Sequence, residues 1–339
     1  ILASTIKAIL KFTKIYHLDE TTIKNYFITR HFMPIKRTCF KSINIFENGS
    51  VNKYSLRTKK MSMEIYEKPS NWISEIKYQE YSKMKESELV DFLDFELNKQ
   101  IKIMIPKINF GCTISGGVDS SLQAAIISKY KDPYKNFVID HGNKKDSIMH
   151  HISKFNTYFK KNISKIKVNE KKYIKLAKQC YEIISSPMHT HDLPGRLEIS
   201  KYFRKHECKV FFSADGCDEL LGGQQIYEKI YKKNYDLEIN QSPYSTIINK
   251  LTNNDSLEDY KIFLDNKWKN TFKKYAFIES KKDRNIQSSL FLDYFIQSVS
   301  VGNRVNDLIS CNNSVEPRNA FISKNILKII INLPLKYKI

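Results

Sequence analysis

Residues 110–121 read FGCTISGGVDSS, a short apolar run followed by a glycine-rich turn and a polar segment. The apolar run predicts a strand over residues 110–114, and the later residues predict a helix over residues 120–130. Between them, Gly116 and Gly117 permit a tight turn whose backbone N–H groups converge on an anion at the positive end of the helix. This stretch therefore predicts a phosphate-binding strand, turn and helix.

The rest of the chain from residue 109 onward alternates short apolar runs with longer amphipathic segments. That rhythm is typical of a parallel sheet wrapped by helices. We expect further strands over residues 136–140 and 210–213, a helix over residues 83–104, and mainly helical structure after Asp236. The predicted fold class is therefore α/β, a parallel sheet with flanking helices and a helical C-terminal part.

A second polar turn, FFSADGCDELLGG at residues 211–223, follows the predicted strand over residues 210–213. Carboxylates at the carboxyl ends of adjacent parallel strands converge on one crevice, where a cation that bridges phosphate oxygens can be held. The first turn is not a Walker P-loop, because that loop is longer and ends in Gly-Lys-Ser/Thr, which this chain lacks.

The string SGGVDSS resembles the PP-loop of the ATP pyrophosphatases. Together with the second turn, it resembles the synthetase domain of the glutamine-hydrolysing asparagine synthetase family. The resemblance implies a PP-loop fold like that of the adenine nucleotide alpha hydrolases, with ATP and Mg²⁺ as cofactors. It also implies that the first loop cradles the departing pyrophosphate, through Ser115, Gly116, Gly117, Ser120 and Ser121.

The same resemblance assigns Asp119 to Mg²⁺, and the convergence of strand ends makes Asp218 its expected partner. Asp215 matches the family's acidic position near the reacting carboxylate, so Asp119, Asp215 and Asp218 are the expected catalytic residues. Ala214 replaces a glycine of the family, which would cost about 1 kcal/mol or more if the position requires a positive φ. The expected nucleotide contacts in this part are Ser213, Ala214 and the backbone of Ile139.

Weaker stretches extend the resemblance to nearly the whole chain, at residues 3–9, 38–43 and 315–323. Residues 1–60 are therefore expected to be a C-terminal remnant of the glutaminase domain with its linker. Residues 80–339 are expected to be the synthetase domain, truncated at its C-terminus. The ammonia is then expected to come from a glutaminase domain that this chain does not contain.

The resemblance implies a ligase that converts aspartate to asparagine through β-aspartyl-AMP, releasing AMP and pyrophosphate. In the stretch 315–323 the family's proline and final aspartate are missing. Just before this stretch, Leu308 replaces an arginine of the family. These losses affect the expected identity of the substrate more than the expected use of ATP. Two alternatives stay open: an amide synthetase for another carboxylate in a natural-product or surface-polysaccharide pathway, and a non-catalytic PP-loop remnant with a binding role.

The composition limits the kinds of partner expected for this chain. The formal charge of +20 comes mostly from lysines spread along the chain, so we expect a solvated exterior and not a nucleic-acid surface. No run approaches the roughly 18 apolar residues that span a bilayer, and the six scattered cysteines indicate neither a zinc site nor disulfides. We therefore expect a cytoplasmic enzyme with no membrane partner, which could form a homodimer.

Overall fold

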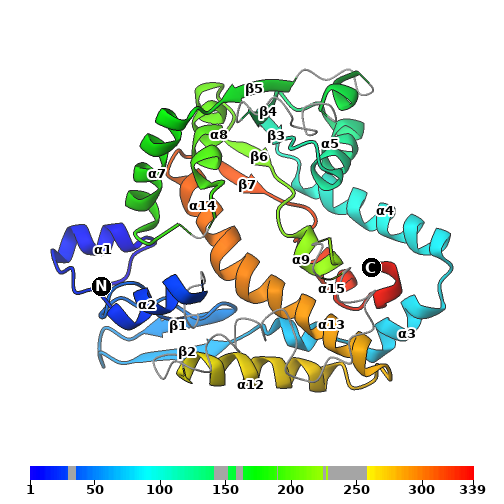
Figure 1. Cartoon of the computed structure of the whole chain (residues 1–339), viewed down its shortest axis with the longest axis horizontal. Helices are drawn as coiled ribbons and strands as arrows, with labels where there is room; N and C mark the ends of the chain where they lie inside the picture. Colours follow the sequence, from blue (N-terminus) through cyan, green and yellow to red (C-terminus); the bar gives the residue numbers. More distant parts are fainter. Residues whose placement is uncertain (30–35, 141–151, 158–162, 189, 224–226, 228–257) are drawn as a thin grey trace. The chain divides into compact units, whose positions relative to one another are not determined.

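The computed structural model describes residues 1–29, 36–140, 152–157, 163–188, 190–223, 227 and 258–339 (Figure 1). The chain divides into two compact units, each built from three separate segments. The first unit comprises Ile1–Phe12, Lys85–Cys217 and Gly302–Leu327, and the second comprises Thr13–Met84, Asp218–Val301 and Lys328–Ile339. The domain limits expected from the sequence, at residues 60 and 80, stay a prediction.

A five-stranded parallel sheet forms the centre of the first unit, in the order β5-β4-β3-β6-β7. The predicted α/β class, with its parallel sheet and flanking helices, is confirmed. The predicted strands over residues 110–114, 136–140 and 210–213 correspond to β3, β4 and β6, whereas β5 and β7 were not predicted. The strands are β3 (Phe110–Thr113), β4 (Lys135–Asp140), β5 (Ile163–Lys167), β6 (Val210–Phe212) and β7 (Glu316–Arg318).

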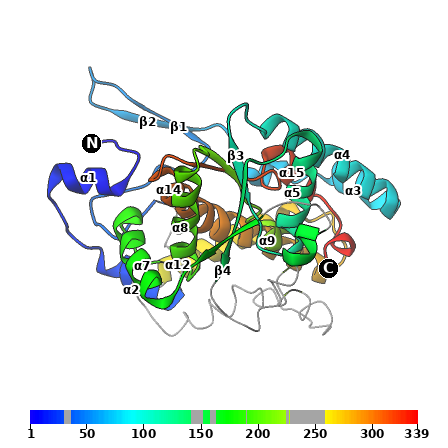
Figure 2. The ribbon, with the colours of Figure 1, turned by 90° about the horizontal axis from the view of Figure 1, so that it is seen from above.

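Helices cover both faces of this sheet. In Figure 2, α5 lies on one side of β3 and α8 lies on the other. Helix α4 packs on α5, while α7 and α14 both pack on α8. The helices of this unit are α4 (Glu86–Met104), α5 (Val118–Tyr130), α7 (Glu170–Ile184), α8 (Leu193–Lys205) and α14 (Arg304–Cys311). Three further helices continue across the limits of the two units: α1 (Ile6–Thr13), α9 (Cys217–Leu221) and α15 (Lys324–Ile330).

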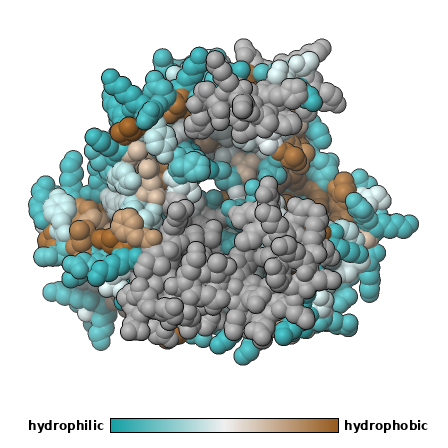
Figure 3. All heavy atoms as spheres, viewed as in Figure 1, coloured by the Kyte–Doolittle hydropathy of each residue, from teal (hydrophilic) through white to brown (hydrophobic). Residues whose placement is uncertain are grey.

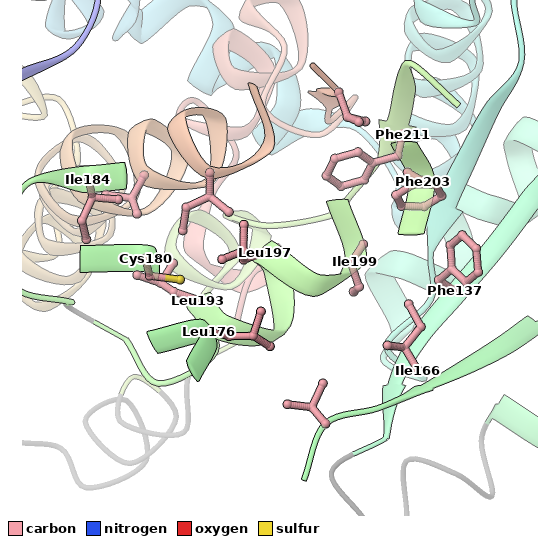
Figure 4. Close-up of a cluster of buried hydrophobic side chains, with 14 of the residues drawn as sticks. Phe137, Ile166, Leu176, Cys180, Ile184, Leu193, Leu197, Ile199, Phe203 and Phe211 are labelled. Atoms are coloured by element: carbon pink, nitrogen blue, oxygen red, sulfur yellow. The ribbon is translucent and has the colours of Figure 1, made fainter. Parts of the chain in front are cut away.

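Aromatic rings join α8 to the sheet (Figure 4). The buried Phe203 of α8 stacks on Phe211 of β6 at 4.9 Å between ring centroids and meets Phe137 of β4 edge-on at 5.0 Å. Gly111 of β3 leaves room for the Phe203 ring, because an added Cβ would overlap that ring and the carbonyl oxygen of Lys135. The absence of a side chain at Gly111 therefore sets how closely α8 approaches β3.

The second unit combines an antiparallel hairpin with helices. Its Asn332 accepts a hydrogen bond from the backbone N–H of Ser74 (2.8 Å) and donates one to the carbonyl of Trp72 (2.9 Å), which joins segments about 260 residues apart. Its elements are α2 (Glu20–Thr29), β1 (Ser50–Tyr54), β2 (Met61–Ile65), η1 (Pro69–Trp72), α3 (Glu75–Lys83), α12 (Glu258–Lys274), α13 (Lys281–Leu292), most of the π-helix η3 (Asp293–Asn303) and η4 (Leu335–Tyr337).

The face of the molecule seen in Figure 3 is largely hydrophilic over the described residues, with smaller apolar patches. Lysine supplies much of the charge of this chain, so a solvated exterior is the simplest reading of its composition. Within the described ranges, every helix is too short or too polar to cross a membrane.

We expect Gly111→Ala to lower the free energy of unfolding by about 1–3 kcal/mol, because the new methyl group collides with a buried ring and a backbone oxygen. Thermal and urea unfolding measure this change. Gly117→Ala is the matched control, since its added Cβ would meet only the Ser115 hydroxyl oxygen at 3.4 Å. Equal stability losses in the two variants would contradict the tight packing of Phe203 on β3.

Candidate functional site

The first loop leaves β3 at Thr113 and enters α5 at Val118. Gly116 has a φ of +83°, a region that side chains strongly disfavour, and Gly117 is the N-cap residue with extended backbone. The helix thus begins two residues before the predicted start at Ser120. Its first backbone N–H groups have no partner within the helix, which makes the loop suited to an anion.

Serine hydroxyls close this loop on itself. The Oγ atoms of Ser115 and Ser120 lie 3.0 Å apart, and the Ser115 backbone N–H donates to Ser120 Oγ at 3.1 Å. The Ser121 backbone N–H donates to the Gly117 carbonyl at 3.2 Å, which forms the first turn of α5. Asp119 lies half-buried in that turn. The predicted loop residues are therefore brought together at the helix N-terminus, and pyrophosphate binding by them stays a prediction.

The second loop leaves β6 at Phe212 and is tied to its neighbours by a buried glutamine. Gln123 of α5 donates from Nε2 to the Ser213 carbonyl at 2.9 Å, and its Oε1 accepts from the Ala320 N–H at 3.0 Å. The Ser213 N–H donates to the Arg318 carbonyl at 2.9 Å. Gln123 is only 2% exposed, so it holds α5, this loop and the segment after β7 in a fixed arrangement.

Ala214 does not require a positive φ. The left-handed position of this loop falls on Gly216, whose φ is +97°, and Ala214 is not among the residues with positive φ. The replacement of glycine by alanine at this position therefore costs no backbone strain of the kind considered from the sequence.

Asp215 is held by an arginine that sequence analysis did not identify. Arg196 donates from Nη1 and Nη2 to the two carboxylate oxygens of Asp215 at 2.6 and 2.8 Å, and from Nε to Asp192 at 2.6 Å. The amides of Asn306 and Asn319 donate to the Asp215 carboxylate (3.3 Å) and carbonyl (2.5 Å). These contacts fix both the side chain and the backbone of Asp215.

Charges in this cluster reinforce one another. Burial alone would lower the pKa of Arg196, but the carboxylates of Asp215 and Asp192 outweigh it and raise that pKa above its ordinary value. Burial likewise opposes ionisation of Asp192, yet the Arg196 guanidinium and the hydrogen bond from Thr190 lower the pKa of the Asp192 carboxyl. The net result is that Arg196 stays charged, because the two carboxylates outweigh its burial.

A cavity of about 230 Å³ opens at the carboxyl ends of β3, β4 and β6. This edge of a parallel sheet is where ligands bind in open α/β folds. Ile139 lies in its wall, packed close to Gly195 of α8, where an added Cβ would lie 3.3 Å from Ile139 Cγ1, and its contact with a nucleotide stays a prediction. The remaining wall contains apolar side chains, among them Ile114, Val138 and Ile199, and polar residues, among them Ser115, Ser213 and Asp215.

A second cavity, of about 540 Å³, adjoins the first and shares Ser213, Asp215 and Asn306 with it. Asp215 therefore lies in the wall common to both. The wall of the larger cavity carries further polar and charged groups, including Asn303, Asp307, Glu316, Arg318 and Asn319. Two adjoining cavities with a shared carboxylate can hold two substrates side by side.

Asp218 lies in the first turn of α9, at the start of a segment of the second unit. Its carboxylate packs against the backbone of Gly223, where any side chain would collide with it. Across the described ranges, no three His, Cys, Asp or Glu side chains gather as a metal site. The sharing of one Mg²⁺ by Asp119 and Asp218 stays a prediction.

The chain was compared with known proteins. The family model described as asparagine synthase matches residues 98–339, well over half of the chain. No curated protein matches it. The matched range contains both loops, all five strands of the parallel sheet and both cavities.

We expect Gln123→Met to lower the free energy of unfolding by about 1–3 kcal/mol, because the Ser213 carbonyl and the Ala320 N–H lose a buried partner. Chemical denaturation measures the loss. Gln100→Met serves as the control, since Gln100 accepts only an exposed hydrogen bond of 3.4 Å. If the two variants unfold at the same denaturant concentration, Gln123 does not fix the loops.

Proposed function

Because the chain belongs to the asparagine synthase family, we propose that it activates the β-carboxylate of aspartate with ATP and joins ammonia to it. The general activity of an ATP-dependent, amide-forming ligase follows from membership of this family. The observation that supports a nucleotide site is the cavity at the carboxyl ends of β3, β4 and β6, whose wall includes Ser115 of the first loop.

The chemistry requires activation, because a carboxylate is a poor electrophile until one oxygen becomes part of a leaving group. In the proposed first step, a β-carboxylate oxygen attacks the α-phosphorus of ATP and pyrophosphate leaves, which gives β-aspartyl-AMP. Ammonia then attacks the acyl carbon, AMP leaves with its oxygen, and one proton is lost from the nitrogen. The products are asparagine, AMP and pyrophosphate.

The described residues suggest a division of tasks for these steps. The apolar wall beside Ile139 suits adenine, and the loop from Ser115 to Ser121 suits the phosphates. Asp215, in the wall shared by both cavities, is suited to the side where the carboxylate substrate and ammonia meet.

Mg²⁺ fits the donors that this chain offers. It is usually bound through one or two carboxylates together with substrate phosphates, and seldom by an all-protein cage. Asp119 and Asp218 would hold it, and a bound Mg²⁺ would neutralise charge on the phosphate oxygens.

Ammonia is proposed to come from a glutaminase domain outside these residues.

A second candidate function keeps the ATP chemistry but changes the acceptor. The cavity of about 540 Å³ lies in the size range of pockets for larger ligands, so it also admits carboxylates bigger than aspartate. Screening carboxylic acids for AMP release separates the two candidates.

We expect the full gene product to catalyse exchange between radiolabelled pyrophosphate and ATP, and aspartate to stimulate it. Exchange reports the reversible first step without requiring ammonia. Succinate, which lacks the amino group, is the control acid. Exchange that responds to another acid and not to aspartate would remove asparagine as the product while retaining the adenylation chemistry.

We expect Asp119→Asn to raise the Mg²⁺ concentration needed for half-maximal exchange by about 10-fold or more, because a neutral amide is a weaker ligand than a carboxylate. A titration of Mg²⁺ at fixed ATP measures the shift. Asp132→Asn, an exposed acidic residue beyond the other end of α5, is the control. An unchanged Mg²⁺ requirement in Asp119→Asn would contradict the assignment of Asp119 as a ligand.

A further inference from the structure

The wall of the larger cavity contains a carboxylate without a cationic partner. Two other carboxylates in this wall, those of Asp215 and Glu316, each accept from an arginine, at 2.6 and 2.8 Å. Asp307 is exposed and accepts only a weak hydrogen bond from the Cys311 thiol, at 3.4 Å. Among the described residues of this wall, Asp307 therefore presents a negative charge that a ligand can neutralise.

An arginine without a partner lies one turn earlier on the same helix. Arg304 begins α14, directly after Asn303 of the cavity wall and three residues before Asp307. Its side chain is half-buried, and this burial lowers the pKa of Arg304 because no carboxylate among the described residues offsets it. A cation held partly out of water is costly unless a ligand supplies the opposite charge.

Helix geometry places these two charges on one face of α14. Residues three positions apart on a helix have Cβ atoms about 5–6 Å apart, so one small molecule can meet both Arg304 and Asp307. An α-amino acid carries an ammonium group and a carboxylate on the same carbon atom, which matches this pair of charges. A dicarboxylate without an amino group leaves Asp307 without a partner.

We propose that α14 makes the enzyme specific for an α-amino acid as the carboxylate acceptor. The Asp307 carboxylate binds the ammonium group of the acceptor, and the Arg304 guanidinium binds its α-carboxylate. This inference rests on the proposed function, since it requires the larger cavity to receive the acceptor. Both are specificity-determining residues, because neither contacts the carboxylate that reacts.

This arrangement leaves the side-chain carboxylate of the acceptor free to react. Asn306, which directly precedes Asp307, lines both cavities, and so does Asp215. An acceptor held by its α-groups at α14 can therefore extend its side chain toward the wall that the two cavities share. The nucleotide is proposed to lie on the other side of that wall.

Two analogues of aspartate separate the two contacts. Succinate is aspartate without the ammonium group, and β-alanine is aspartate without the α-carboxylate. The test measures exchange between pyrophosphate and ATP in the full gene product with each of the three acids, for Asp307→Asn and Arg304→Gln. The control variants are Asp94→Asn and Arg204→Gln, at exposed positions on α4 and α8 that do not line either cavity.

We expect Asp307→Asn to raise the KM for aspartate and for β-alanine by about 10-fold to 100-fold, without raising that for succinate, because a charge-assisted hydrogen bond is lost. Arg304→Gln should raise the KM for aspartate and for succinate by a similar factor, and leave that for β-alanine unchanged. The kcat with aspartate should change little in either variant. Both control variants should behave as the unchanged protein.

Equal changes of KM for all three acids would overturn the proposal, since they would indicate a structural role for both residues. Unchanged KM values would also overturn it, since Arg304 and Asp307 would then contact only each other or water.

Two further outcomes separate this inference from the proposed function. If another α-amino acid stimulates exchange and aspartate does not, aspartate is not the substrate, and the same crossed pattern with that acid and its two analogues supports the proposal. If the unchanged protein shows no exchange, the proposed function fails, and calorimetric affinities for aspartate, succinate and β-alanine then decide the matter. Affinities that do not follow the crossed pattern would overturn the role of Arg304 and Asp307.

Discussion

Parallel pairing of β3 with β4 on one side and β6 on the other is the constraint on which the candidate site depends. Parallel strands end at the same edge, so the loops that follow β3 and β6 open toward one crevice even though the ends of these strands are 99 residues apart in the chain. The aromatic contacts of Phe203 hold α8 on the sheet, and Gly195 near the start of α8 lies close to Ile139 at that edge. Sheet topology therefore gathers the loop serines, Ile139 and Asp215 before any specific side-chain bond is considered.

A buried glutamine and a half-buried arginine then fix the polar contacts at this edge. Gln123 satisfies backbone groups of two loops at once, and Arg196 offsets one of the two negative charges of Asp192 and Asp215, which would otherwise repel each other more strongly. Removing either group leaves partners unsatisfied in a poorly hydrated place, which costs far more than an exposed hydrogen bond. The site's geometry and its charge are thus controlled by the same few contacts.

The sequence was informative where the signal is local. The apolar runs at β3, β4 and β6 and the glycine-rich loop identify themselves within a few residues. Strand β5 escaped because lysines interrupt its apolar pattern, and β7 escaped because it has only 3 residues, one of which is Pro317. Gln123 escaped because its partners lie 90 and 197 residues away, so that only the fold brings them together. Arg196 escaped because no motif pairs it with Asp215, which lies 19 residues further along the chain. Asp218 was identified from its motif, and its place beside Asp119 stays a prediction.

A crystal structure of the full gene product with a non-hydrolysable ATP analogue and Mg²⁺ tests the central claim most directly. The account predicts adenine against Ile139 in the smaller cavity, with the phosphates running past Ser115 along the loop that begins α5. A nucleotide bound elsewhere, with this edge of the sheet empty, would contradict it.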